Sequence, residues 1–396
     1  EKVYATINGK ANDSQLCFSS GEMFRLIESY ITDNFGEKGK FRFVIAPDDT
    51  PYACTCPSCT AIGNTEKNAT PAVTELILRL SQRFPRHFFF TTSYLTTQQV
   101  TDKQLPPNAG VIVSAINFPL RRIDGKDAKE KAFAGQLEQW KNVTKNIYIW
   151  DYINNFDDYL TPMPILKIAR QRLQFFKQHG ASGIFFNGSG YSYSSFDEMR
   201  TFVLSALLIN PELSVDNLTA SFFNQEYPAA KKWLYDYYTD LENGTQSGKR
   251  LGIYAGIRES EKAYLTPEKF IKFYDEMNDF VSNAKGKERK KLHELQTALS
   301  YTRMEMGREH SFDAYGYAKR NGKSLQPIPQ VQEWLTQLKE HKAFTGMEYY
   351  NESSDEIGNY IKEWEEYIFA SDLKKNLFLG VTPSVIPQAY KNHIKK

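Results

Sequence analysis

The sequence is poor in cysteine and has no long apolar run. Only four cysteines occur in 396 residues, and all of them lie within the first 59. No apolar run approaches the ~18 residues that a membrane-spanning helix needs, so we expect no membrane span. The formal net charge is only +2. The one basic cluster, at 285–291, is interpreted as the solvated start of a helix, so no nucleic-acid partner is expected.

Familiar catalytic signatures and a leader segment are also missing. The six histidines include no HExxH-type pair, and no local pattern indicates Ser/His/Asp chemistry. No signal peptide is present, and the first residue is Glu1 rather than Met. We therefore expect a trimmed or mature fragment whose natural start lies further upstream.

Aromatic and apolar residues are abundant. The sequence is 41% hydrophobic and 14% aromatic, which is enough for a sizeable core in one large or two ordinary domains. Aromatic side chains pack cores, but they also form the stacking platforms of sugar-binding clefts.

The first 211 residues alternate between short apolar runs and amphipathic segments. Ser20 predicts the cap of a helix over 21–35, Thr70 and Pro71 predict the cap and first residue of another, and Pro162 predicts the start of a third that ends at Gly180. The strand-like runs are continuously apolar, which favours a parallel sheet covered on both faces. These predicted strands are 41–46, 87–94, 111–116, 146–152 and 183–187.

From about 212 onward the pattern is helical. Helices are predicted over 214–242, 266–310, 328–342 and 353–370, with breaks at 227–228 and 244–256 and no strand between them. We expect two domains: residues 1–211 as the C-terminal part of a TIM-like catalytic barrel, and 212–396 as a mainly α-helical region packed on it.

Five strands do not close an eight-stranded barrel. If 41–46 is the fourth strand, the first three lie upstream of Glu1. The fold class predicted is therefore α/β, a (β/α)8 barrel whose N-terminal strands are missing from this chain. A complete five-stranded, doubly wound sheet is the alternative.

Polar residues follow nearly every predicted strand, and in a parallel barrel these strand ends share one face. Asp48 and Asp49 follow the first strand. Neighbouring carboxylates raise the pKa of one of them, which suits an acid in glycoside hydrolysis. The alternative is structural, because Asp-Asp-Thr-Pro is also good turn chemistry.

Other strand ends supply candidate substrate-binding residues. Trp150 is predicted to stack on a sugar, and Asp151 or Tyr152 to bond a hydroxyl or amide; core packing is the alternative for Trp150. Asn187 and Tyr191 are predicted to bind hydroxyls, unless their segment is an ordinary loop. The remaining candidates, from position alone, are Tyr94 and Asn117.

The cysteines are Cys17, Cys54, Cys56 and Cys59. Four thiolates suit a tetrahedral structural zinc site, although this spacing is not that of a standard zinc ribbon. Disulfides, in an exported protein, and unlinked thiols are the alternatives. In each case we expect the group to brace the loop beneath the Asp pair.

Several of these stretches together resemble the bacterial, Bacteroides-type domain of unknown function 4838, part of which is classed as glycoside hydrolase family 163. The matching stretches are 15–18 (QLCF), 47–49 (PDD) with the following cysteines, 150–152 (WDY), 183–188 (GIFFNG) and 207–211 (LLINP). The resemblance implies a (β/α)8 barrel with an upstream β domain and a helical region after it. Characterised members resemble endo-β-N-acetylglucosaminidases acting on N-glycans, and many members have no known activity.

The resemblance also implies roles for the two acids. In the family the position of Asp48 is commonly Asn, so Asp49 is expected to be the general acid and Asp48 to orient the substrate's acetamide group. The expected reaction is retaining, substrate-assisted hydrolysis of β-linked N-acetylglucosamine without a catalytic cofactor. The expected partner is an oligosaccharide or glycoprotein glycan, and the expected location is outside the bacterial cytoplasm, in the periplasm or at the cell surface. A non-catalytic glycan-binding protein, or a hydrolase of another sugar such as a uronide, is the alternative.

Overall fold

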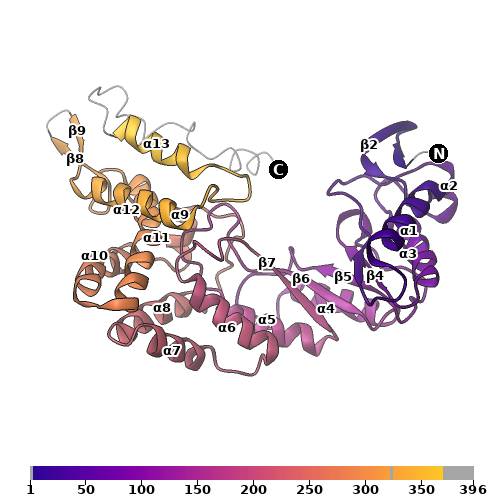
Figure 1. Ribbon diagram of the computed structural model, residues 1–396, viewed down its shortest axis with the longest axis horizontal. Helices are drawn as coiled ribbons and strands as arrows, with labels where there is room; N and C mark the ends of the chain where they lie inside the picture. Colours follow the sequence, from indigo (N-terminus) through magenta and orange to yellow (C-terminus); the bar gives the residue numbers. More distant parts are fainter. Residues whose placement is uncertain (1–2, 322–323, 369–396) are drawn as a thin grey trace. The chain divides into compact units, whose positions relative to one another are not determined.

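The computed structural model describes residues 3–321 and 324–368 (Figure 1). Its contacts divide the chain into two compact units, which are described separately. The first, called the sheet unit, comprises Glu1–Phe118, Asp124–Tyr152 and Phe175–Asn187. The second, called the helical unit, comprises Pro119–Ile123, Ile153–Gln174 and Gly188–Lys396.

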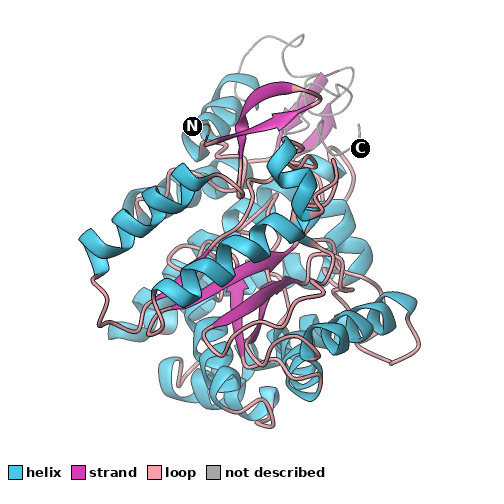
Figure 2. Ribbon diagram, turned by 90° about the vertical axis from the view of Figure 1, so that its right-hand side faces the viewer, coloured by secondary structure: helices cyan, strands magenta, loops and turns pink. Residues whose placement is uncertain are grey.

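A curled, five-stranded parallel sheet forms the centre of the sheet unit (Figure 2). Neighbouring strands follow the order of the sequence, whereas a doubly wound sheet reverses its strand order at a switch point. The predicted α/β class and parallel sheet are therefore confirmed, in the form of a half-barrel; the structure does not extend to a closed eight-stranded barrel. The strands are β3 (Arg42–Val44), β4 (Phe88–Ser93), β5 (Ala109–Ser114), β6 (Ile147–Tyr152) and β7 (Gly183–Asn187).

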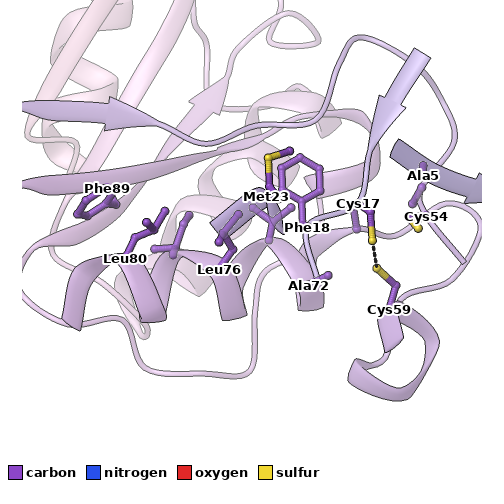
Figure 3. Packing of buried hydrophobic residues seen from close by; sticks show 14 of the residues in the cluster. Ala5, Cys17, Phe18, Met23, Cys54, Cys59, Ala72, Leu76, Leu80 and Phe89 are labelled. Atoms are coloured by element: carbon purple, nitrogen blue, oxygen red, sulfur yellow. Dashed lines mark hydrogen bonds between the residues drawn. The ribbon is translucent and has the colours of Figure 1, made fainter. Parts of the chain in front are cut away.

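Helices pack against one face of this sheet. Helix α1 (Gly21–Phe35) begins after Ser20, whose hydroxyl accepts the Met23 N–H as predicted. Helix α3 (Thr70–Arg83) packs on β4 and β5, and α4 (Ala128–Lys141) packs on β6. Figure 3 shows the resulting core, in which Leu76 and Leu80 of α3 and Phe89 of β4 belong to one cluster of buried residues.

The predicted cap of α3 is displaced by one residue. Ala69 occupies the capping position, and Thr70 is the first helical residue. The Thr70 hydroxyl instead donates to the carbonyl oxygen of Gln99, at 3.1 Å. The tertiary contact therefore outweighs the local capping preference.

The two faces of the sheet differ in burial. On the face toward the helices Phe89, Val113 and Ile149 are fully buried. On the opposite face Val44 and Phe185 are 51% and 53% exposed. The expectation of a sheet covered on both faces is therefore wrong for the residues that the structure describes. A strand can also be apolar throughout when helices bury only its alternate residues. The sequence alone does not distinguish such a strand from one that is buried on both faces.

A small hairpin precedes the sheet and was not predicted. Strands β1 (Tyr4–Ile7) and β2 (Lys10–Leu16) pair in antiparallel fashion around Asn8 and Gly9, which both have positive φ. This is the backbone of a type I′ hairpin turn, for which Asn-Gly is strongly preferred. The remaining short elements of the sheet unit are α2 (Pro57–Ile62) and the 3₁₀ turn η1 (Leu95–Thr97).

The helical unit is mainly helical after residue 212, as the sequence predicts, but the helix predicted over 266–310 is divided into α10 and α11, and α9 was not predicted. The break at 227–228 lies between α7 and α8, as expected. The expectation of no strands there is wrong, because β8 (Ala318–Asn321) pairs with β9 (Ser324–Pro327). Residues 369–370, predicted as the end of the last helix, lie outside the described residues. The helices are α6 (Asp197–Ile209), α7 (Val215–Glu226), α8 (Lys231–Thr245), α9 (Ile257–Ala263), α10 (Pro267–Asn283), α11 (Gly286–His310), α12 (Gln330–Thr345) and α13 (Ile357–Ile368).

Helix α5 (Leu166–Gln178) begins four residues later than the predicted Pro162. Pro164 disfavours helical dihedrals at the residue before it. The carboxylate of Glu242 then accepts the N–H groups of Leu166 and Lys167, at 2.8 and 3.0 Å. The helix start is thus fixed by a distant acid rather than by a local cap. Across the described part of the chain, every helix is too short or too polar to cross a bilayer.

Candidate functional site

Asp48 and Asp49 lie just past β3, at the carboxyl end of the parallel sheet. The backbone of this turn is held by Gln15, a buried residue of β2. Its Oε1 accepts the Asp48 N–H at 3.2 Å, and its Nε2 donates to the Asp48 carbonyl oxygen at 3.3 Å. The Thr50 N–H donates to the same carbonyl oxygen, at 2.7 Å. Both aspartate side chains are exposed, so the turn fixes the backbone and leaves the two carboxylates at the surface.

Strand β6 places Trp150 and Tyr152 on the uncovered face of the sheet and Asp151 on the other. Trp150 is half-buried and contacts the Phe185 ring edge-on, with 4.9 Å between centroids. Its indole N–H is buried and has no acceptor among the described residues. Asp151 is fully buried, and its Oδ1 accepts the Tyr152 N–H at 2.9 Å. Asp151 therefore cannot contact a ligand on the uncovered face, whereas Trp150 and Tyr152 can.

The other strand ends supply further groups at the same edge. Asn187 is the last residue of β7 and pairs in register with Tyr152, whose hydroxyl lies 3.4 Å from the Ser114 Oγ of β5. Asn117 is exposed in the turn after β5, and Tyr94 is half-buried directly after β4. Parallel strands end at one edge of a sheet, so the strand-end positions predicted from the sequence share that edge.

Tyr191 belongs to the helical unit and is not placed relative to this edge. It is 46% exposed, and its hydroxyl lies so close to Gly188 that a Cβ there would be 2.7 Å from it. Its loop is held within the helical unit. Asn154 Nδ2 donates to the Ser189 carbonyl oxygen at 2.6 Å, and the Ser194 N–H donates to that of Gly190 at 2.7 Å.

A cavity of about 260 Å³ in the helical unit was not predicted. Burial raises the pKa of Asp197 in its wall to about 6, and burial lowers the pKa of His341 to about 4. The His341 Nε2 lies 2.7 Å from the Tyr193 carbonyl oxygen, which requires a proton on that nitrogen. Lys291 pairs with Glu226 at 2.8 Å. The wall combines α6, α7, α11 and α12, so no local sequence pattern could have indicated it.

The four cysteines come together at the end of the sheet unit near the hairpin. Their sulfur atoms all lie within 4.8 Å of one another, and none forms a disulfide. Cys17, Cys54 and Cys59 are buried, and Cys56 is half-buried. Hydrogen bonds from Cys17 and Cys59 hold the pKa of the Cys54 thiol well below its usual value. The hydrogen bond with Cys54 in turn raises the pKa of Cys17 to about 11. The predicted grouping of the cysteines is thus present, and it is compatible with both a zinc site and free thiols.

Comparison with known families identifies one match. The model of the family described as "Domain of unknown function (DUF4838)" matches residues 2–240. The chain belongs to this DUF4838 family. The match covers the whole sheet unit and, in the helical unit, ends within α8. No curated protein matches the chain.

Membership in DUF4838 confirms the resemblance seen in the sequence as far as the family goes. The matched region contains the Asp pair, all four cysteines, the strand ends and the Tyr191 loop. The cavity wall in α11 and α12 lies beyond the matched residues. Every residue predicted from the sequence as part of a site therefore belongs to the part of the chain that defines the family.

Proposed function

We propose that this protein is a glycoside hydrolase that cleaves β-linked N-acetylglucosamine in N-glycan-type oligosaccharides. One observation carries the proposal: an exposed carboxylate pair stands at the same sheet edge as a half-buried tryptophan on an uncovered sheet face. Carbohydrate sites commonly combine an aromatic platform with a few polar groups that fix the sugar's orientation.

We further propose that the sheet is the C-terminal half of a (β/α)8 barrel. Three features support this. The strands follow sequence order, helices cover one face, and the opposite face carries exposed apolar side chains such as Val44 and Phe185. In a closed barrel that face points inward and is packed by residues of the other strands. The strand ends then surround a common hollow, where barrel enzymes carry their chemistry.

The reaction we propose uses the two carboxylates differently. Asp49, protonated, donates its proton to the leaving glycosidic oxygen. The substrate's own acetamide oxygen attacks the anomeric carbon and forms a cyclic oxazolinium ion, and Asp48 orients the acetamide and stabilises the positive charge. Water then opens the ring with net retention, with Asp49 now acting as the base. The half-exposed ring of Trp150 offers a surface on which a sugar can stack.

A second candidate is favoured by the exposure of the two aspartates. A general acid at neutral pH needs its pKa raised, by burial or by a like charge held close to it. In the described residues the carboxylates of Asp48 and Asp49 are exposed, so neither is buried. Glycan binding without hydrolysis, on the same edge, is therefore the alternative. Either function is consistent with export to the periplasm or cell surface, which we include in the proposal.

The test is hydrolysis of a glycopeptide that carries an N-glycan with a β-linked N-acetylglucosamine core, followed by mass spectrometry. We expect cleavage by the protein and a loss of 100-fold or more in kcat/KM for Asp49→Asn, in line with removal of a general acid. Asp48→Asn is expected to lose less, since an amide still bonds the acetamide group. A thiazoline analogue of the oxazolinium ion should inhibit competitively.

Asp102→Asn is the matched control, because Asp102 is another exposed aspartate of the sheet unit that lies away from the strand ends. It should leave both cleavage and binding unchanged. Glycan binding without any cleavage, lost in Trp150→Ala, would establish the binding alternative. Cleavage of β-uronides in preference to N-acetylglucosaminides would overturn the proposed substrate class, and full activity in Asp49→Asn would remove Asp49 from the mechanism.

A further inference from the structure

The distances within the cysteine cluster match the edges of a metal-centred tetrahedron. The Cys17 sulfur lies 3.7 Å from that of Cys56 and 3.8 Å from that of Cys59. Disulfide-bonded sulfurs are about 2.05 Å apart, so these contacts are not disulfides. A tetrahedral zinc ion with Zn–S bonds of about 2.3 Å places its sulfur ligands about 3.8 Å apart. These two distances are therefore those of a zinc site, and all four sulfurs lie within 4.8 Å of one another.

Hydrogen-bond donors lie beside several of the sulfur atoms. The backbone N–H of Thr6 points at the Cys54 sulfur at 3.2 Å, and that of Cys59 points at the Cys56 sulfur at 3.5 Å. The Ser19 hydroxyl lies 3.0 Å from the Cys59 sulfur. Such donors stabilise negative charge on sulfur. Four thiolates packed this closely would repel one another strongly without a cation between them.

The ligands come from separate parts of the chain. Cys17 follows β2, Cys54 and Cys56 lie in the loop after the Asp pair, and Cys59 is in the short helix α2. Figure 3 shows Cys17, Cys54 and Cys59 gathered at one end of the apolar core, beyond Phe18 and Ala72. A small, polar hairpin and a six-residue helix bury little apolar surface of their own, which is the setting in which structural metals occur.

We propose that Cys17, Cys54, Cys56 and Cys59 bind one structural Zn²⁺ ion through four thiolates. The four thiols release their protons to solvent as four Zn–S bonds form, and nothing is oxidised or reduced. All four positions are filled by protein sulfur, so the ion has no place for water or substrate and serves the fold. The site joins the β1–β2 hairpin to the loop between β3 and α3. This inference is independent of the proposed hydrolase function.

The first experiment is metal analysis of the protein purified without chelators or added reductant. We expect about one zinc per chain, and cobalt substitution should give the sulfur-to-metal charge-transfer bands and intense visible bands of a tetrahedral four-thiolate site. A mercurial reagent that binds thiols should release the zinc and lower the melting temperature. Free thiols without zinc, one or two disulfides in the intact protein, or iron in place of zinc would each overturn the proposal.

Variants locate the ion. Cys59→Ser is expected to lose the zinc, and Ser19→Ala is the matched control, because Ser19 contacts the cluster without being a ligand. Ser19→Ala should retain about one zinc. If Cys59→Ser does not fold, Cys56→Ser, which changes the half-buried ligand, replaces it, and the cobalt spectrum should shift toward that of a three-sulfur site. Full zinc content in Cys59→Ser, or an unchanged four-sulfur cobalt spectrum in Cys56→Ser, would contradict the assignment.

Discussion

Acidic residues occupy opposite environments in the two units. In the sheet unit Asp48 and Asp49 are exposed at a strand end, where a turn holds their backbone and leaves the carboxylates without a described partner. In the helical unit Asp158 and Glu242 are buried, and each carboxylate accepts two backbone N–H groups. A raised pKa commonly points to a functional site. Here burial raises the pKa of both acids of the helical unit, and their geometry shows them capping backbone segments.

The comparison therefore separates two kinds of chemistry-bearing residue. Asp158 and Glu242 of the helical unit are committed to the backbone that they cap, so they stabilise the fold. Those at the sheet edge are available to a ligand. The largest stability effects of changing an acid should fall in the helical unit, and the largest effects on binding or catalysis at the sheet edge.

The strongest test on the structural side is Glu242→Ala. The change leaves the N–H groups of Leu166 and Lys167 without acceptors at the start of α5, and we expect a loss of about 3–4 kcal/mol in the free energy of unfolding. Glu242→Gln should lose less, because one oxygen remains to accept. Urea unfolding followed by circular dichroism measures both, with Glu259→Ala, an exposed acid of α9, as the control. A loss under 1 kcal/mol would mean that Glu242 does not cap α5.

Asp158 gives a pH-dependent version of the same comparison. Burial raises its pKa from 3.8 to about 6, while its Oδ1 accepts the Leu160 and Thr161 N–H groups. Between about pH 4 and pH 6 the folded chain therefore holds a proton on Asp158 that the unfolded chain has released. This proton contributes to folding stability. The contribution is complete below about pH 4 and is lost as pH rises through about 6, and its full size is roughly 3 kcal/mol.

Asp158→Asn should remove that dependence. The amide oxygen still accepts both N–H groups, so the difference in stability between variant and parent should change by roughly 2 kcal/mol between pH 4 and pH 6.5, in favour of the variant at the higher pH. Denaturant titrations at several pH values measure it, and Asp102→Asn should show no such change. A difference that is constant with pH would show that Asp158 titrates normally.

The smallest expected effect lies at the sheet edge. Trp150→Phe keeps an aromatic ring against Phe185 but reduces the surface on which a sugar can stack, and we expect a five- to tenfold loss of glycan affinity, about 1 kcal/mol. Calorimetric titration with an N-glycan oligosaccharide measures it. Tyr30→Phe, at an exposed position of α1, is the control. Unchanged affinity would place the ligand away from the uncovered face and weaken the contrast between the units.

The main elements of the fold could be predicted from the sequence because their signals are local. Each of the five strands is an apolar run, and Ser20 caps α1 where the pattern says it should. The hairpin was missed because β2 is almost entirely polar, although Asn8-Gly9 is a strong turn signal. The start of α5 could not be predicted, because Glu242 lies 76 residues from Leu166.

The candidate site was predictable to a similar extent. The strand-end positions of Asp48, Asp49, Trp150 and Asn187 followed from apolar runs that stop at polar residues. The period of two along a strand could also have shown that Asp151 faces away from Trp150 and Tyr152. The cavity near Asp197 required the packing of four helices, so it could not be predicted from spacing, whereas the grouping of Cys17 with the other three cysteines was predicted and is present.

Gln15 has a consequence beyond the turn that it holds. Its amide meets the backbone of Asp48 with a donor and an acceptor, as the next rung of a β-ladder would, and it stands only two residues before Cys17. A displacement of Cys17 is therefore expected to move Gln15 and, through its hydrogen bonds to Asp48, the segment that carries both aspartates. If the proposed zinc site and the proposed hydrolase function both hold, a reagent that removes the zinc would slow glycan hydrolysis without binding at the sheet edge.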